Sequence, residues 1–207
     1  MPNWCENDLI IMGGKNALKD FMNEVGNDGS CFDFDKIIPM PKELKIQSGG
    51  LTNKGLAVFL AEKDKDYKEI DKLNSYEWAK DKTREELIAE FKEDKIAMKL
   101  GEQAYKNLKK HECADWYEWS IKYWGTKWNS SDAEIIKRTS KSVHIRFMTA
   151  WSPPLPVITI ASEKYPYLKF SIRYYEMGCG FEGHLIIKAG KTIQHKTNDN
   201  YKGNRGG

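Results

Sequence analysis

The chain has 207 residues, of which 40% are hydrophobic and 30% are charged, and its formal net charge is +3. No apolar run approaches the roughly 18–20 residues that span a bilayer, which argues against a membrane protein. The net charge is too small to identify a nucleic-acid-binding protein, so a basic surface has to come from the arrangement of the charges. The length predicts one large domain or one domain with an insertion.

The first 40 residues predict a strand, a helix and a second strand. Asp8–Met12 is a short apolar run, which is typical of a strand. Asn16–Val25 has apolar residues at i, i+3, i+4 and i+7, which predicts a helix that ends at Gly26. Cys31–Ile38 follows and predicts the second strand, which Pro39 ends.

The middle of the chain changes character and predicts helices. Leu51–Lys110 is rich in Lys, Glu, Asp, Leu and Ala. Thr83 and Glu86 have the spacing of a capping box, which marks the start of a helix. A helical apolar stripe follows and is broken near Gly101. We therefore expect two to four helices, inserted at about 51–128 between two halves of a sheet.

The second half returns to strand patterns. Ile135-Ile136 and Val143–Phe147 flank a polar turn and predict a hairpin. Ser152 is expected to cap a helix. Leu168–Tyr175 alternates apolar and polar residues, and Phe181–Ile187 predicts the returning strand. Residues 191–207 are polar and predict a flexible tail.

This order of elements predicts an α+β fold in a single domain over residues 1–190. Two βαβ-like halves that form one antiparallel sheet, with helices on one face, make a ferredoxin-like (split βαβ) architecture with a helical insertion between the halves. The four cysteines form no C-x-x-C pair, and no basic segment followed by an apolar one opens the chain. We therefore expect no signal peptide and reduced thiols in a cytoplasmic protein.

Five short strings, taken together, carry a resemblance to a known family. They are Met1–Asn7, Trp124–Trp128, Thr149–Pro154, Tyr175–Gly178 and Gly180–Gly183. The set resembles the YubB-type ferredoxin-like family carried by phages, plasmids and integrated elements. The resemblance implies a ferredoxin-like C-terminal half, an origin in a mobile element and a bacterial host cell. It implies no catalytic residue.

The polar face of the predicted sheet is the first candidate site. It would carry the side chains of His144, Arg146, Lys169, Ser171, Arg173 and Tyr175, and that of His184 as a further member. Cations that face each other on adjacent strands repel, and an anionic partner relieves that repulsion. Open ferredoxin-like sheets bind RNA in this way, so the face predicts binding of nucleic acid or a nucleotide. The alternative is an ordinary solvated face of an antiparallel sheet.

A segment rich in aromatic residues is the second candidate site. On a helix, Trp116, Trp119 and Tyr123 would share one face, and Trp124 and Trp128 would lie on another. One amphipathic helix cannot bury both faces against a single sheet, so we predict that the first three residues contact a protein partner. The alternative is that the insertion wraps around and buries all of them.

Catalytic sites are less well supported by the sequence. Asp33 and Asp35 alternate on a predicted strand and, with other acids, would make a Mg²⁺ site of a metal-dependent nuclease. The other acids considered are Glu6, Asp8, Glu176 and Glu182. Cys179 with His184 or His144 would need an orienting group and an oxyanion site to act as a nucleophile. We predict no catalytic residue, no metal and no cofactor.

The sequence and the resemblance together lead to one preferred function and two alternatives. The preferred hypothesis is an accessory binding protein of a phage or plasmid, which inhibits a host defence complex, such as a nuclease or a CRISPR ribonucleoprotein, through protein contacts. The first alternative is binding of nucleic acid or a nucleotide by the basic sheet face. The second is a metal-dependent nuclease.

Overall fold

The computed structural model describes residues 3–63 and 79–200, and the chain divides into two compact units. Unit 1 consists of Met1–Pro39 and Ser120–Gly207, and unit 2 consists of Met40–Trp119. The single predicted domain is thus two units, and the helical segment that interrupts the first unit covers residues 40–119 rather than 51–128. Part of the predicted helical insertion, residues 64–78, lies outside the described residues.

Unit 1 contains one six-stranded antiparallel sheet, whose strand order is β2-β3-β1-β4-β5-β6. The strands are β1 (Trp4–Met12), β2 (Ser131–Arg138), β3 (Ser142–Ala150), β4 (Lys169–Glu176), β5 (Phe181–Lys188) and β6 (Lys191–Asn198). With the helices that follow β1 and β3, the first four strands make the βαββαβ pattern of a ferredoxin-like fold. The β5–β6 hairpin extends the sheet beyond β4. The predicted fold class is therefore confirmed.

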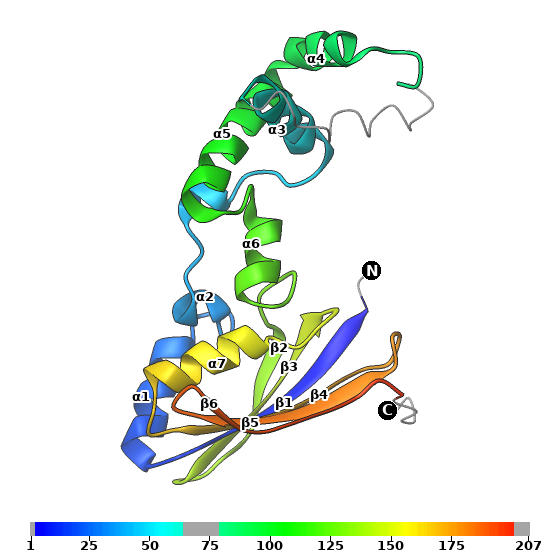
Figure 1. The fold of residues 1–207 in the computed structure, drawn as a ribbon. Helices are drawn as coiled ribbons and strands as arrows, with labels where there is room; N and C mark the ends of the chain where they lie inside the picture. Colours follow the sequence, from blue (N-terminus) through cyan, green and yellow to red (C-terminus); the bar gives the residue numbers. More distant parts are fainter. Residues whose placement is uncertain (1–2, 64–78, 201–207) are drawn as a thin grey trace. The chain divides into compact units, whose positions relative to one another are not determined.

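Helices of unit 1 cover one face of this sheet (Figure 1). They are α1 (Lys15–Val25), α2 (Phe34–Ile37) and α7 (Leu155–Lys164). Strand β1 shows why: Cys5, Leu9 and Ile11 alternate along it and are fully buried toward the helices. Phe21 of α1 and Phe170 of β4 are buried between the two layers, with ring centroids 5.5 Å apart. We call the sheet face that these helices leave uncovered the outer face.

The predicted second strand, Cys31–Ile38, is wrong, because this segment contains α2. Asp33 is the N-cap of that helix, and its side chain accepts a hydrogen bond from the Asp35 backbone N–H at 2.9 Å. Phe34 and Ile37, three residues apart, are both buried on the same side of the turn. A cap followed by an i, i+3 apolar pair is a helical signal, and it overrides the alternating pattern.

The predicted tail is wrong for residues 191–198, which form β6. The connection to β5 runs through Ala189 and Gly190, which both have positive φ angles (50° and 72°), as a tight hairpin turn requires. Residues 201–207 of that tail lie outside the described residues. Ser152 is not a helix cap either: its hydroxyl donates to the Gly125 carbonyl at 2.6 Å, and Pro154 is the N-cap of α7.

Unit 2 is helical, as predicted. It contains η1 (Lys42–Leu44), α3 (Gly50–Lys63), α4 (Arg84–Glu93) and α5 (Lys95–His111), and α6 (Trp116–Tyr123) begins in it. The Thr83–Glu86 capping box is present, but the break between helices falls at Asp94 rather than at Gly101. Gly101 lies inside α5, where a Cβ atom would come within 2.1 Å of the Gly55 carbonyl carbon. These two glycines let the backbones of α3 and α5 approach closely.

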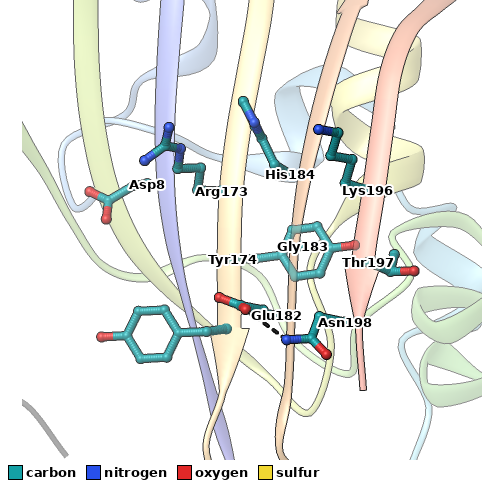
Figure 2. A pocket seen from close by; sticks show the side chains of 10 residues that line it. Asp8, Arg173, Tyr174, Glu182, Gly183, His184, Lys196, Thr197 and Asn198 are labelled. Carbon is teal, nitrogen blue, oxygen red and sulfur yellow. Dashed lines mark hydrogen bonds between the residues drawn. The ribbon is translucent and has the colours of Figure 1, made fainter. Parts of the chain in front are cut away.

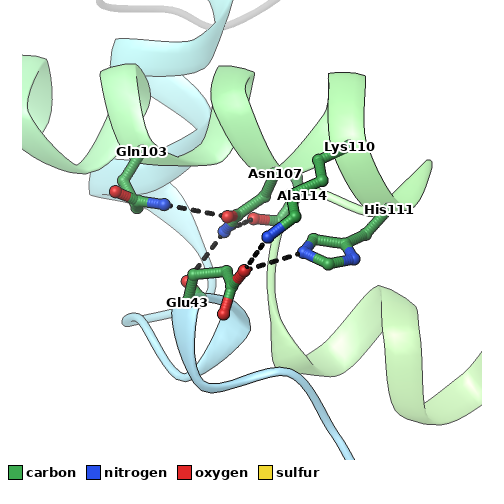
Figure 3. Close-up of polar contacts among 6 residues, drawn as sticks. All are labelled: Glu43, Gln103, Asn107, Lys110, His111 and Ala114. Atoms are coloured by element: carbon green, nitrogen blue, oxygen red, sulfur yellow. Dashed lines mark hydrogen bonds and ion pairs between the residues drawn. The ribbon is translucent and has the colours of Figure 1, made fainter.

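A polar clamp joins η1 to α5 (Figure 3). The buried Asn107 amide donates to the backbone carbonyls of Glu43 at 2.9 Å and of Ala114 at 3.0 Å. Lys110 donates to the Glu43 carboxylate at 2.5 Å, and the His111 ring lies 3.2 Å from the same oxygen. Lys110, the backbone and His111, in that order, lower the pKa of Glu43 to about 2.

Candidate anion-binding face of the sheet

Register places the residues of the outer face in rows that cross the strands. One row reads Glu134, Arg146, Asp8, Arg173, His184 and Lys196 from β2 to β6. A second row reads Met12, Lys169, Lys188 and Lys191 from β1 to β6. The structure thus brings the predicted residues His144, Arg146, Lys169, Arg173 and Tyr175 onto one face, and β6 adds two cations that the sequence analysis assigned to a tail.

The β3–β1 half of the outer face is neutralised internally. Asp8 accepts a hydrogen bond from Arg146 Nε at 3.3 Å, and its Oδ1 atom lies 2.8 Å from His144 Nε2. Glu134 of β2 lies opposite Arg146 in the register. Positive and negative groups alternate here, so this half attracts a polyanion only weakly.

The β4–β6 half carries an excess of positive charge. Arg173, Lys169, Lys188, Lys191 and Lys196 make no ion pair with any described acidic residue. Lys169 lies directly opposite Lys188, and Lys188 lies directly opposite Lys191. Like charges in facing positions of antiparallel strands are destabilising. We call these five side chains the cationic face.

A hollow of about 600 Å³ lies on this half of the sheet. In Figure 2, Arg173, His184 and Lys196 stand in one row across β4, β5 and β6, Tyr174, Gly183 and Thr197 follow, and Glu182 and Asn198 lie beyond them. Asn198 Nδ2 donates to Glu182 Oε1 at 3.0 Å. The volume falls within the roughly 300–1,000 Å³ of typical ligand sites, and the cations supply donors for anionic oxygens.

His184 lies between two cations, Arg173 and Lys196, in the register of the sheet. Burial, followed by the charges of Arg173 and Lys196, lowers the pKa of His184 below its ordinary value of 6.5. Ser171 Oγ lies 2.8 Å from His184 Nε2, and Gln194 Nε2 lies 3.5 Å from His184 Nδ1. This pair does not form a nucleophilic site: the third group is an amide, and the backbone N–H groups of β4 pair with strands on both sides.

The comparisons with known proteins agree with this fold. Residues 123–204 match the model of the ferredoxin-like domain in Api92-like protein. The chain is also similar to the crystal structure of the protein api92 from Yersinia pseudotuberculosis, with a TM-score of 0.51 and 10% sequence identity. That similarity covers 96% of this chain and 98% of the api92 chain, and at this identity it shows the fold alone. A search of curated proteins found no match.

Hydrogen bonds connect the short sequence segments that carry the family resemblance. Some join two segments within residues 123–204, and one joins that region to β1. The Asn7 amide donates to Thr149 Oγ1 at 2.9 Å, and Thr126 Oγ1 donates to the Ala150 carbonyl at 2.8 Å. Both pairs are buried. The buried Glu176 carboxylate accepts the Gly178 backbone N–H at 2.6 Å and so closes the turn after β4. These residues hold one end of the sheet together, which is a structural role.

The predicted partner-binding set of aromatic residues is wrong for Trp119. Its side chain is only 4% exposed, whereas Trp116 and Tyr123 are half-buried. Trp124 is also buried, and its indole N–H donates to the Ile38 carbonyl at 3.0 Å. The segment therefore offers no continuous aromatic face, because the central residue of the predicted set is inside the molecule.

A different aromatic cluster lies on the surface of unit 1. Trp4, Trp128 and Trp151 are each 37–38% exposed, and the Trp4 and Trp128 ring centroids lie 6.1 Å apart. Lys127 Nζ lies 4.6 Å from the Trp128 centroid and 4.9 Å from that of Trp151. We call these four residues the tryptophan patch. Alternation along β1 was the available signal, because Trp4 shares a side with Glu6 whereas Cys5 faces the core.

The predicted pair of Asp33 and Asp35 on one strand face does not form. Asp33 is buried and accepts hydrogen bonds from the Asn27 and Asn129 amides, both at 2.6 Å, in addition to its role as an N-cap. Asp35 does not share a strand face with it, because both lie at α2. Within the described residues, no three His, Cys, Asp or Glu side chains are placed to hold a metal ion.

The Cys179 thiol is not activated as a nucleophile. A hydrogen bond with Glu176 and the charge of that carboxylate raise the pKa of Cys179 above its ordinary value. His184 is hydrogen-bonded to Ser171 and His144 to Asp8, so neither predicted base acts on this thiol.

In the described part of the chain, no helix is long and apolar enough to cross a membrane.

Proposed function

We propose that this protein binds nucleic acid through phosphate contacts on the cationic face. The supporting observation is the row of Lys169, Lys188 and Lys191 on three adjacent strands, none of them paired with a described acid. Phosphate groups supply the missing negative charge, and lysine and arginine are their usual ligands. The row with Arg173 and Lys196 continues the same surface toward the hollow.

Protection of a sheet edge is the competing explanation for such lysines. Edge strands often carry lysine to prevent pairing with another chain, and β6 is an edge strand. That explanation accounts for Lys191 and Lys196. It does not account for Lys169 and Arg173 on β4 or Lys188 on β5, because those strands are paired on both sides. A ligand that spans three strands accounts for all five.

The test is binding of a fluorescent single-stranded oligonucleotide, followed by anisotropy at several salt concentrations. We expect binding that weakens steeply with salt, and a smaller salt slope for the Lys188→Gln/Lys191→Gln variant. The matched control is Lys15→Gln/Lys19→Gln, which removes two exposed lysines of α1 on the other side of the sheet. Equal slopes for all three proteins would exclude the cationic face as the site.

A second candidate function, binding of an acidic protein segment, is supported by a groove of about 830 Å³ on unit 2. Ile96, whose side chain is 65% exposed, lines it together with lysines that have no ion pair to a described acid. Those lysines are Lys42, Lys95 and Lys99. An acidic helical peptide with leucines at i and i+4 is the probe, and Ile96→Asp is expected to abolish its binding. A lysine-rich peptide of the same pattern should not bind.

The inhibition of a host defence complex and the origin in a mobile element stay predictions from the sequence. The residues predicted to contact such a partner included Trp119, which is buried. The groove on unit 2 is a better-exposed surface for that role. The two candidate functions use different units, so variants of one surface leave the other intact.

A further inference from the structure

We infer that the nucleic acid is single-stranded and that its unpaired bases stack on Trp4 and Trp128 of the tryptophan patch. This inference rests on the proposed function and names its substrate class. A base presents its π-face only when it is released from a duplex, and aromatic side chains bind that face regardless of sequence. The cationic face alone would accept a duplex or any other polyanion.

The patch has the exposure that a stacking site requires. Trp4, Trp128 and Trp151 keep more than a third of their surface accessible, although tryptophan is usually buried. The rings of Trp4 and Trp128 are tilted by 45° with centroids 6.1 Å apart, so they form a shared apolar surface rather than a closed stack. Lys127 places a cation within 5 Å of two of these rings, where the phosphate of a stacked nucleotide finds a counter-charge.

The patch continues the outer face. Trp4, Glu6 and Asp8 alternate on the same side of β1, and Glu6 lies opposite Tyr175 of β4. Tyr175 precedes the turn by two residues and follows Arg173 by two residues on the same side. At a rise of about 3.3 Å per residue, Trp4 lies about 13 Å along β1 from the row that contains Arg173. A single-stranded oligonucleotide of a few nucleotides spans that distance.

An acidic row separates the patch from the cations, and it favours bases over phosphates at that point. Glu6 accepts a hydrogen bond from the Tyr175 hydroxyl, and Glu182 accepts one from Asn198. Carboxylates repel phosphate but accept hydrogen bonds from the amino groups of bases. Along the outer face, the tryptophan rings come first, the carboxylate acceptors second and the cations third. These groups match the faces of the bases, the edges of the bases and the phosphates, respectively.

The experiment compares three probes of similar length: single-stranded oligothymidylate, a DNA duplex and inorganic polyphosphate, which has phosphates but no bases. We expect the unaltered protein to prefer the single strand. Trp4→Leu and Trp128→Leu should each weaken single-strand binding by about 5- to 150-fold, the range for one lost base stack, and leave polyphosphate binding unchanged. Trp4→Phe should recover part of the loss, and Trp116→Leu, outside the patch, should have no effect.

The outcomes separate the inference from the proposed function. If the single strand and polyphosphate bind equally and Trp4→Leu changes neither, the inference is wrong while the cationic face stands. If Lys188→Gln/Lys191→Gln changes neither, the proposed function is wrong. Thermal unfolding checks that each variant folds. A change of oligomeric state in Trp128→Leu would show that the patch contacts a second copy, which overturns the inference.

Discussion

The salt dependence of binding is the sharpest test of the cationic face, because its magnitude follows from a count of contacts. Replacing Lys188 and Lys191 by glutamine removes two of the five cations and leaves polar side chains that are one atom shorter. For a single strand, log K falls with log[salt] by about 0.7 per neutralised phosphate, so five contacts give a slope of about −3.5 and three give about −2.1. Between 50 and 200 mM salt, binding then weakens about 130-fold in the unaltered protein and about 18-fold in the variant.

The assay is fluorescence anisotropy with a labelled oligothymidylate, repeated at four or more salt concentrations. The Lys15→Gln/Lys19→Gln variant has the same net charge as the test variant, so it separates local contacts from the overall field of the protein. We expect its slope to match that of the unaltered protein. If the control lowers the slope as much as the test variant, long-range charge explains the binding, and the reasoning from strand register fails.

Three further predictions concern pH and stability. His184→Gln should make binding less dependent on pH, because in the unaltered protein a bound phosphate favours the imidazolium form of His184 and affinity therefore rises as pH falls. Without ligand, the lowered pKa means that the unaltered protein is more stable above pH 6.5 and loses that increment as pH falls, which urea titrations of both proteins will test. Lys188→Gln alone should raise the free energy of unfolding by about 0.2–1 kcal/mol, since it removes the charge that faces both Lys169 and Lys191; a loss of stability in denaturant titration would contradict this. Gly101→Ala should lower the stability of unit 2 by about 1–3 kcal/mol, despite the better helix propensity of alanine, because the new methyl meets the backbone of Gly55; an unchanged unfolding midpoint would show that α3 and α5 separate easily.

The elements that were predicted correctly are those in which packing against the core requires apolar residues at regular intervals. β4 alternates Phe170 and Ile172 with polar residues because one side of it is buried. β6 has no such signal: its only apolar residue among Lys191–Asn198 is Ile193, which is 60% exposed. It is a strand because β5 offers it a row of hydrogen-bonding groups after a tight turn. That cause lies outside its own residues.

The candidate site was partly predictable for the same reason. Alternation placed Arg146, Lys169 and Arg173 on one side of their strands, but it gives no information about which residues lie opposite one another. The facing of Lys188 with Lys191 depends on register, which the turn fixes. The burial of Trp119 depends on how the eight-residue helix α6 packs. The helical period shows which residues share a face, but it does not show which face is buried.

The two edges of the sheet show why solubility alone does not explain the cationic face. At the β2 edge the outer residues carry both signs: Glu134 lies opposite Arg146, and Lys137 lies opposite His144. Interspersed charges keep a surface soluble without mutual repulsion. At the β6 edge Lys191 faces Lys188, and Lys188 also faces Lys169 on β4, so like charges lie side by side across three strands. The two edges therefore differ in how their charges are arranged, and the proposed binding of a polyanion across β4–β6 accounts for that difference.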